Sequence, residues 1–199
     1  MAVTAAGGRR VPAVAAGVAV VVYVASILGA NWMIAHVGRP LGPNHVLPVG
    51  FGLVAPSGVY LAAVTFVARD LVQRFGGPRV GLAAIVVGAA LSAFVASPRL
   101  ALASGATFLV SETCDFLIFT PLQQRNLPVA VLGAGLVAEV VDSVLFLTLA
   151  GIPLAVALPG QLVGKGWVIV AGGAVTALLR RALPAPRPAG RAPAGATGP

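Results

Sequence analysis

Only five acidic residues occur in this sequence, and four of them fall within long apolar runs. An ionisable side chain is costly inside a membrane, so it usually faces the interior of a helix bundle or a water-filled cavity and marks a functional site. A carboxylate in such a place can accept hydrogen bonds from a small molecule or carry a proton. The four residues are Glu112, Asp115, Glu139 and Asp142.

The four acids form two pairs with the same spacing. Glu112 and Asp115 are three residues apart, as are Glu139 and Asp142, so each pair lies on one face of a helix. Ser111 shares the face of Asp115. We expect the two acidic faces to meet across one central cavity. The alternative is that the pattern recurs by chance, or that the acids pair with buried donors and hold the helices together.

A further charged pair lies near the end of the second apolar run. Asp70 and Arg74 are four residues apart, which suits either an interfacial salt bridge of little energetic value or an ionic latch at an inner gate. Both interpretations remain open on the sequence. We expect the neighbouring Arg69 to extend its charged end toward the membrane surface.

Asn31 and Trp32 come late in the first apolar run. Together they could offer an amide and a flat stacking surface to a planar ligand. The alternative is an interhelical hydrogen bond from the asparagine and a place for the tryptophan in the aromatic belt at the membrane boundary.

The residues that usually carry catalysis or bind metals are sparse. His36 and His45 lie outside any H-E-x-x-H motif, so no metal site is expected. Ser111 lacks a G-x-S-x-G context, which disfavours an intramembrane serine protease. Cys114 is the only cysteine, which excludes an intrachain disulfide and a cysteine zinc cluster. We therefore expect neither an enzyme nor a bound cofactor.

Composition identifies the class of protein. Of 199 residues, 58% are hydrophobic and only 9% are charged, whereas a soluble domain carries about 25% charged residues. The chain is therefore an integral membrane protein in contact with the lipid bilayer. Its net charge of +8 points to cytoplasmic loops beside anionic lipid and not to nucleic acid.

The apolar runs predict six transmembrane helices in an all-α fold. We expect a tail at 1–12, a transmembrane domain at 13–181 and a disordered, proline-rich cytoplasmic tail at 182–199. The six spans are expected at 13–37, 51–76, 80–97, 100–120, 128–150 and 162–179.

Two connecting segments need separate mention. Residues 38–50 are rich in glycine and proline and should form a loop, as should 151–160. The Pro-Ser-Gly segment at 56–58 could begin the second helix, after a short dipping loop at 51–55. It could instead break a helix inside the membrane.

Basic residues predict that both termini lie in the cytoplasm. Ten of them fall on the inner side in this orientation, and Arg39, Arg99 and Lys165 fall on the outer side. The ten are Arg9, Arg10, Arg69, Arg74, Arg79, Arg125, Arg180, Arg181, Arg187 and Arg191.

The motifs, in their order and spacing, resemble one family. They are Asn31-Trp32, the segment R-D-L-V-Q-R-F-G at 69–76, Ser111-Glu112-x-x-Asp115 followed by F-T-P-L at 119–122, and Asp142-Ser143 with Phe146. Between about residues 30 and 151 the chain resembles the queuosine precursor transporters, also called the vitamin uptake transporter family. It departs from them at Arg69, where the family more often has a small polar residue, and in a very short loop after the third span.

The resemblance implies a six-helix carrier of the inner (plasma) membrane, similar in architecture to the substrate-binding subunits of energy-coupling-factor vitamin transporters. The implied cargo is a 7-deazaguanine, such as 7-cyano-7-deazaguanine or its aminomethyl relative. The polar positions of the family correspond here to Asn31, Asp70, Arg74, Glu112, Asp115 and Asp142.

Such a cargo suits the acidic residues. A deazaguanine presents a ring N–H and an exocyclic amine on one edge, and a carboxylate can accept both. Phe108, Phe116 or Trp32 could stack on the ring. A buried carboxylate could also carry a proton with the cargo.

Other classes remain possible on the sequence. The chain could be the substrate-capturing subunit of an ATP-driven importer, which would need an energy-coupling partner, or it could form a homo-oligomer. A membrane enzyme acting on lipid would need an acidic metal cluster or a nucleophile–base pair. A purely structural membrane protein is disfavoured by the buried acids.

Overall fold

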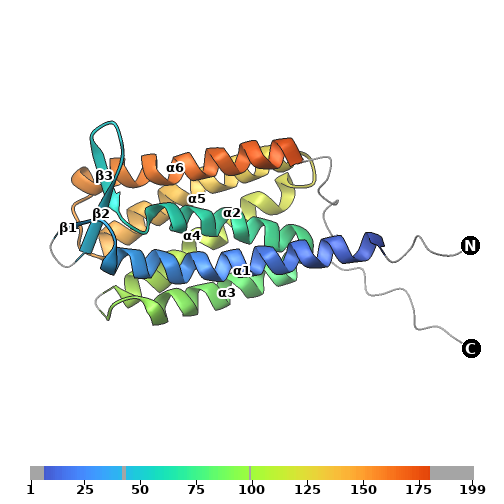
Figure 1. Ribbon diagram of the computed structural model, residues 1–199, viewed down its shortest axis with the longest axis horizontal. Helices are drawn as coiled ribbons and strands as arrows, with labels where there is room; N and C mark the ends of the chain where they lie inside the picture. The colour runs from blue at the N-terminus through green and yellow to red at the C-terminus, as the bar shows by residue number, and fades with distance from the viewer. Residues whose placement is uncertain (1–6, 42–43, 99, 180–199) are drawn as a thin grey trace, which may run out of the picture.

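The computed structural model describes residues 7–41, 44–98 and 100–179, which form six α-helices and one three-stranded sheet. The helices lie side by side in a bundle, and the sheet covers one end of it (Figure 1). The first turn of α1 and the last turn of α6 lie at the opposite end. The helices are α1 (Gly7–His36), α2 (Val59–Gly76), α3 (Pro78–Val95), α4 (Ala101–Leu122), α5 (Leu127–Leu149) and α6 (Leu154–Leu179).

Five of the helices, all except α2, are long and apolar enough to cross a membrane. The prediction of a helical membrane protein is therefore confirmed. The remaining helix, α2, carries Arg69, Asp70 and Arg74 and lies in the middle of the bundle (Figure 1). Eleven of its 18 residues are buried, compared with 28–39% of the apolar windows of the other five. Its charges therefore face protein, and a sixth crossing by α2 stays a prediction.

The segment between α1 and α2 is a sheet where the sequence predicted a loop. It consists of β1 (Arg39–Leu41), β2 (Asn44–Gly50) and β3 (Leu53–Pro56), paired antiparallel in that order. Gly50, Phe51 and Gly52 all have positive φ at the turn that joins β2 to β3. The glycines that suggested a loop therefore serve a tight hairpin.

The second helix begins directly after the Pro-Ser-Gly segment at 56–58. The interpretation of these residues as a break inside a membrane helix is therefore wrong, because a strand and not a helix precedes them. They lead into α2, as the other interpretation held, although 51–55 belongs to the hairpin and not to a dipping loop.

The last helix begins earlier than predicted. Residues 151–160 were expected to form a loop, but α6 begins at Leu154 and includes Pro159 and Gly160. A Cβ atom built on Gly160 would lie 2.0 Å from the backbone oxygen of Val54. This glycine is thus required by the close approach of β3 to α6 and does not mark the end of a helix.

The close approach at Gly160 leads to a stability prediction. Gly160→Ala should lower the free energy of unfolding by about 1–3 kcal/mol, because a methyl group would force β3 away from α6. Gly133→Ala adds the same methyl group to α5, where the nearest atom is 3.9 Å away. That control should be neutral or slightly stabilising. Thermal unfolding of both variants in detergent tests this, and equal shifts in Tm would contradict it.

The other helix boundaries are close to the predicted ranges. The largest difference is that α1 begins at Gly7, and α4 continues through Pro121 to Leu122. The predicted tail at 182–199 lies outside the described residues.

Candidate functional site

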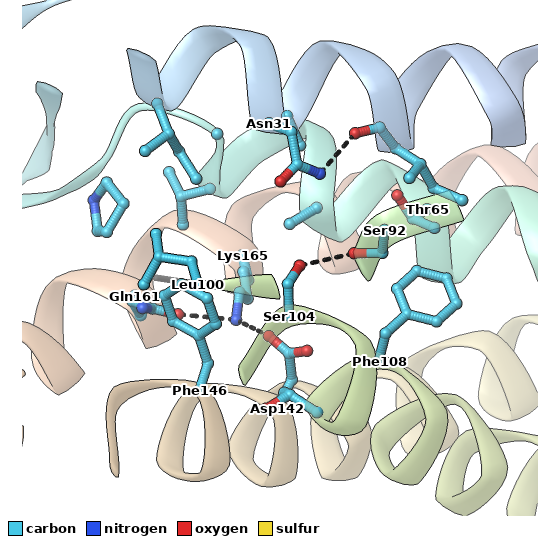
Figure 2. A pocket seen from close by; sticks show the side chains of 18 of the residues that line it. Asn31, Thr65, Ser92, Leu100, Ser104, Phe108, Asp142, Phe146, Gln161 and Lys165 are labelled. Atoms are coloured by element: carbon cyan, nitrogen blue, oxygen red, sulfur yellow. Dashed lines mark hydrogen bonds and ion pairs between the residues drawn. The ribbon is translucent and has the colours of Figure 1, made fainter. Parts of the chain in front are cut away.

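An open cavity lies between the helices in the half of the bundle nearer the sheet. The cavity has a volume of about 100 Å³, or about 770 Å³ when the open space at its mouth is included. In Figure 2, side chains from α1, α2, α4, α5 and α6 surround this one space. Its polar lining is Asn31, Thr65, Ser92, Ser104, Thr107, Glu112, Asp142, Gln161 and Lys165, and its aromatic lining is Phe66, Phe108 and Phe146.

One wall of the cavity is an ion pair between α5 and α6. The Nζ atom of Lys165 donates to Asp142, to Ser143 Oγ at 2.8 Å and to Gln161 Oε1 at 2.8 Å (Figure 2). All three donors of the ammonium group are therefore used. The other oxygen of Asp142 accepts from Ser111 Oγ at 3.3 Å. Asp142 on α5 thus bonds to α4 through Ser111 and to α6 through Lys165.

This arrangement corrects the sequence analysis, which counted Lys165 as an outer charge near the start of the sixth span. Lys165 is only 2% exposed. The prediction failed because α6 begins at Leu154, so Lys165 lies well inside the helix.

Next to the cavity, a second cluster of charged residues surrounds Arg69. Arg69 is fully buried at 0% exposure. Its Nε donates to Glu112 Oε2 at 2.8 Å and its Nη1 to Gln73 Oε1 at 2.7 Å. Its Nη2 donates to Asp115 and lies 3.1 Å from Asp70 Oδ1. The fork of the guanidinium thus joins α2 to α4 through several carboxylates at once.

Two sequence predictions about α2 are therefore wrong. Arg69 does not extend toward the membrane surface, because its guanidinium is bound to carboxylates and lies 5.7 Å from the ring of Phe119. Asp70 does not pair with Arg74, since its ion-pair partner is Arg69. Arg74 instead donates to the backbone oxygen of Gln123 at 3.0 Å. Both interpretations assumed an exposed helix end, whereas α2 is enclosed by other helices.

Glu112 belongs to both the cluster and the cavity. Its Oε2 accepts from Arg69, while its Oε1 is buried without any hydrogen-bond partner. Glu112 also lines the cavity. A buried acceptor without a donor is unfavourable. Among the described residues that line the cavity, Glu112 Oε1 and Thr107 Oγ1 are the buried side-chain atoms without a partner.

Four of the predicted binding residues line the cavity: Asn31, Phe108, Glu112 and Asp142. Ser111 adjoins it through its hydrogen bond to Asp142. The expected meeting of two acidic faces is therefore present in part, since Glu112 comes from α4 and Asp142 from α5.

The other three predicted binding residues lie elsewhere. Asp115 is in the arginine cluster and does not line the cavity. Glu139 is buried but also lies outside the cavity lining. Trp32 is 57% exposed and stacks on His36, with ring centroids 4.9 Å apart, so its ring faces outward.

Sequence reasoning missed Lys165 and Gln161. Lys165 is the only lysine in the sequence, and Gln161 precedes it by four residues in an apolar run. The rule that singled out the acids, a polar residue in a membrane span, would have selected both, had the start of the helix been placed correctly.

A comparison with protein-family models finds one match. The family described as "Putative vitamin uptake transporter" matches residues 92–180. Through this region, which is slightly less than half of the chain, the sequence is similar to the vitamin uptake transporter family. The matched residues include the whole of α4, α5 and α6 within the described chain, and with them Glu112, Asp142 and Lys165. No curated protein and no solved structure matches the chain.

The match confirms the family resemblance noted in the sequence. Together with the apolar helices, it identifies a multi-pass membrane protein of an uptake-transporter family.

Proposed function

We propose that this protein imports a planar, polar heterocycle, and that a 7-deazaguanine such as 7-cyano-7-deazaguanine is the cargo. The observation that carries this proposal is that Glu112, which lines the cavity, has a carboxylate oxygen (Oε1) without a hydrogen-bond partner. A ring N–H and an adjacent exocyclic amine supply donors that a carboxylate accepts in a two-point contact.

The rest of the lining suits the same kind of ligand. Phe108 and Phe146 offer aromatic surface to a flat ring. Asn31 and Gln161 add amide groups, and Lys165 adds a positive charge. The cavity therefore suits a flat ligand with polar edges.

The bundle closes beyond the cavity at the end away from the sheet. There, Gln73 Nε2 donates to Thr120 Oγ1 at 2.9 Å, and Arg74 bonds the backbone oxygen of Gln123. These bonds, with those of Arg69, link α2 to α4. Release of cargo at this end would require α2 and α4 to separate. We infer a carrier that is closed at the end away from the sheet.

The proposed orientation puts the sheet outside the cell and the closed end in the cytoplasm. Arg69, Arg74 and Lys165 are buried and no longer count as loop charges. The remaining basic residues still favour this orientation by eight to two. We propose the inner (plasma) membrane as its location, as the family resemblance implies.

Uptake by cells that cannot synthesise the cargo tests the function. Cells with the protein should accumulate labelled 7-cyano-7-deazaguanine, and cells without it should not. If the protein is shown to be in the membrane and no uptake is seen, the proposal that 7-cyano-7-deazaguanine is the cargo is wrong. Uptake by liposomes that contain only this chain would contradict the alternative of an ATP-driven importer subunit.

A cavity-filling variant tests the site. Ala62 lines the cavity, and Ala62→Phe should reduce uptake roughly tenfold or more, because overfilling a packed site costs about 1–3 kcal/mol. Ala83→Phe makes the same change on the exposed face of α3 and should transport normally. If both variants transport alike, the cargo does not pass through this cavity.

A further inference from the structure

The arginine cluster contains two carboxyl groups that do not reach the cavity. We propose that Asp70 and Asp115 share one proton and form a proton-binding site, coupled to the cargo site through Arg69 and Glu112. This inference rests on the proposed transport function for its coupling, but not for the proton site itself.

The positions of Asp70 and Asp115 indicate that the two side chains bind a proton. Asp70 on α2 and Asp115 on α4 both contact Nη2 of Arg69 and are at most 1% exposed. Because both carboxyl groups contact the same nitrogen atom, they are close neighbours. Asp70 Oδ1, although it lies 3.1 Å from Arg69 Nη2, and Asp115 Oδ2 are nevertheless buried and accept no hydrogen bond. Two carboxylates so close together in a buried site cannot both be ionised, whereas one shared proton supplies the missing donor.

The balance of charges around Arg69 also favours a proton on the aspartate pair. Three carboxyl groups face the single guanidinium of Arg69, and Lys165 is already paired with Asp142. The one charged residue of α3, Arg79, is exposed. The ionisable groups that face the pair, or face Glu112 beside it, are Arg69 on α2, Glu112 on α4, Tyr23 on α1 and Asp142 on α5. Glu139 on α5 and Lys165 on α6 lie next to Asp142 instead.

A proton suits this place better than a metal cation. The guanidinium of Arg69 occupies the centre of the three carboxyl groups, so a further cation of full charge would be repelled. A proton instead converts one carboxylate into a neutral donor. It also removes one of the two uncompensated negative charges around Arg69.

Coupling follows from the position of Glu112, which contacts Arg69 on one side and the cavity on the other. Cargo that donates to Glu112 stabilises its ionised form. That negative charge lies beside the aspartate pair and favours the pair with its proton retained. Coupling is reciprocal, so a proton on the pair keeps Glu112 ionised and ready to accept cargo. Cargo and proton should therefore bind together and move inward together.

The proton site can be tested without any cargo. Infrared spectra of the purified protein at neutral pH should show the carbonyl stretch of a protonated carboxylic acid. Asp70→Asn and Asp115→Asn should each remove one component of this band. Glu139→Gln alters a buried carboxyl outside the cluster and should leave that component in place. A wild-type spectrum without the band, or a band that survives both aspartate variants, would overturn the assignment.

Coupling is tested in liposomes with labelled 7-cyano-7-deazaguanine as the probe. An acidic exterior should drive accumulation by the wild-type protein. Asp70→Asn should lose this accumulation but exchange labelled for unlabelled probe within about threefold of the wild-type rate. Accumulation that survives in Asp70→Asn, or that a sodium gradient drives in its place, would overturn the coupling. If the wild-type protein exchanges no probe, the proposed cargo is wrong, while the infrared result still decides the proton site.

Discussion

Arg69→Met should destabilise this protein more than any other single substitution at a buried charge. Removing one partner of a buried ion pair costs about 3–5 kcal/mol, because the other partner is left buried and uncompensated. Here one guanidinium serves Asp70, Glu112 and Asp115. Thermal unfolding of the purified variant in detergent should show a large drop in Tm and a low yield of folded protein.

The control and the rescue separate this effect from a general loss of charge. Arg79→Met removes an exposed arginine and should change the free energy of unfolding by no more than about 0.5 kcal/mol. Adding Glu112→Gln and Asp115→Asn to Arg69→Met should recover much of the loss, because neutral amides need no cation. If Arg69→Met unfolds at the same temperature as Arg79→Met, the cluster does not hold α2 against α4.

The sequence predicted that four acids lie inside the bundle, but it did not predict the burial of Asp70 or what the acids contact. The spacing of Glu112 and Asp115 within an apolar run was enough to bury them on one face of a helix. Their partner Arg69 lies 43 and 46 residues away along the chain. Which helices are neighbours depends on tertiary packing, and no local pattern in one sequence reports it. The alternative in which buried donors pair with the acids therefore applies to both, and Glu112 remains part of the cavity as well.

The position of α2 explains the remaining errors at the site. A helix with three charges near its end was expected to leave the membrane there, which suggested a surface role for Arg69 and Arg74. The structure encloses α2 between the other helices, so its charges meet protein partners and not lipid headgroups. Hydropathy identified the five helices that are long and apolar enough to cross a membrane. It reports nothing about a polar helix in the centre of a bundle, since such a helix avoids lipid altogether.

The sheet and the start of α6 were missed for one shared reason. Glycine and proline signal a break in regular structure, but a glycine also occurs where two backbones approach closely. Gly160 is such a position, because β3 crosses α6 there. The need for a small residue arises from a contact with Val54, more than a hundred residues earlier in the chain. Sequence alone could not distinguish this glycine from one that ends a helix.

Glu112→Gln should reduce uptake by about 10- to 150-fold without unfolding the protein. The amide oxygen of the glutamine can still accept from Arg69 Nε, which leaves its NH₂ group facing the cavity in place of the free Oε1. A donor edge on the cargo would then meet a donor. The loss of a hydrogen bond to a charged group costs about 1.5–3 kcal/mol, which corresponds to that range of affinity. Cargo binding to the purified protein and uptake by cells would both measure it.

Glu139→Gln is the matched control for this prediction. It makes the same change at a buried glutamate on α5 that does not line the cavity, so cargo binding should be unchanged. Glu112→Gln also removes one of three carboxyl groups around a single guanidinium. Its thermal stability should therefore stay close to that of the wild-type protein, and a loss of binding could not be attributed to unfolding. Cargo binding by Glu112→Gln as tight as by Glu139→Gln would exclude Glu112 from recognition. The donors of the cargo would then have to be accepted by Asp142, the other carboxylate on the cavity wall.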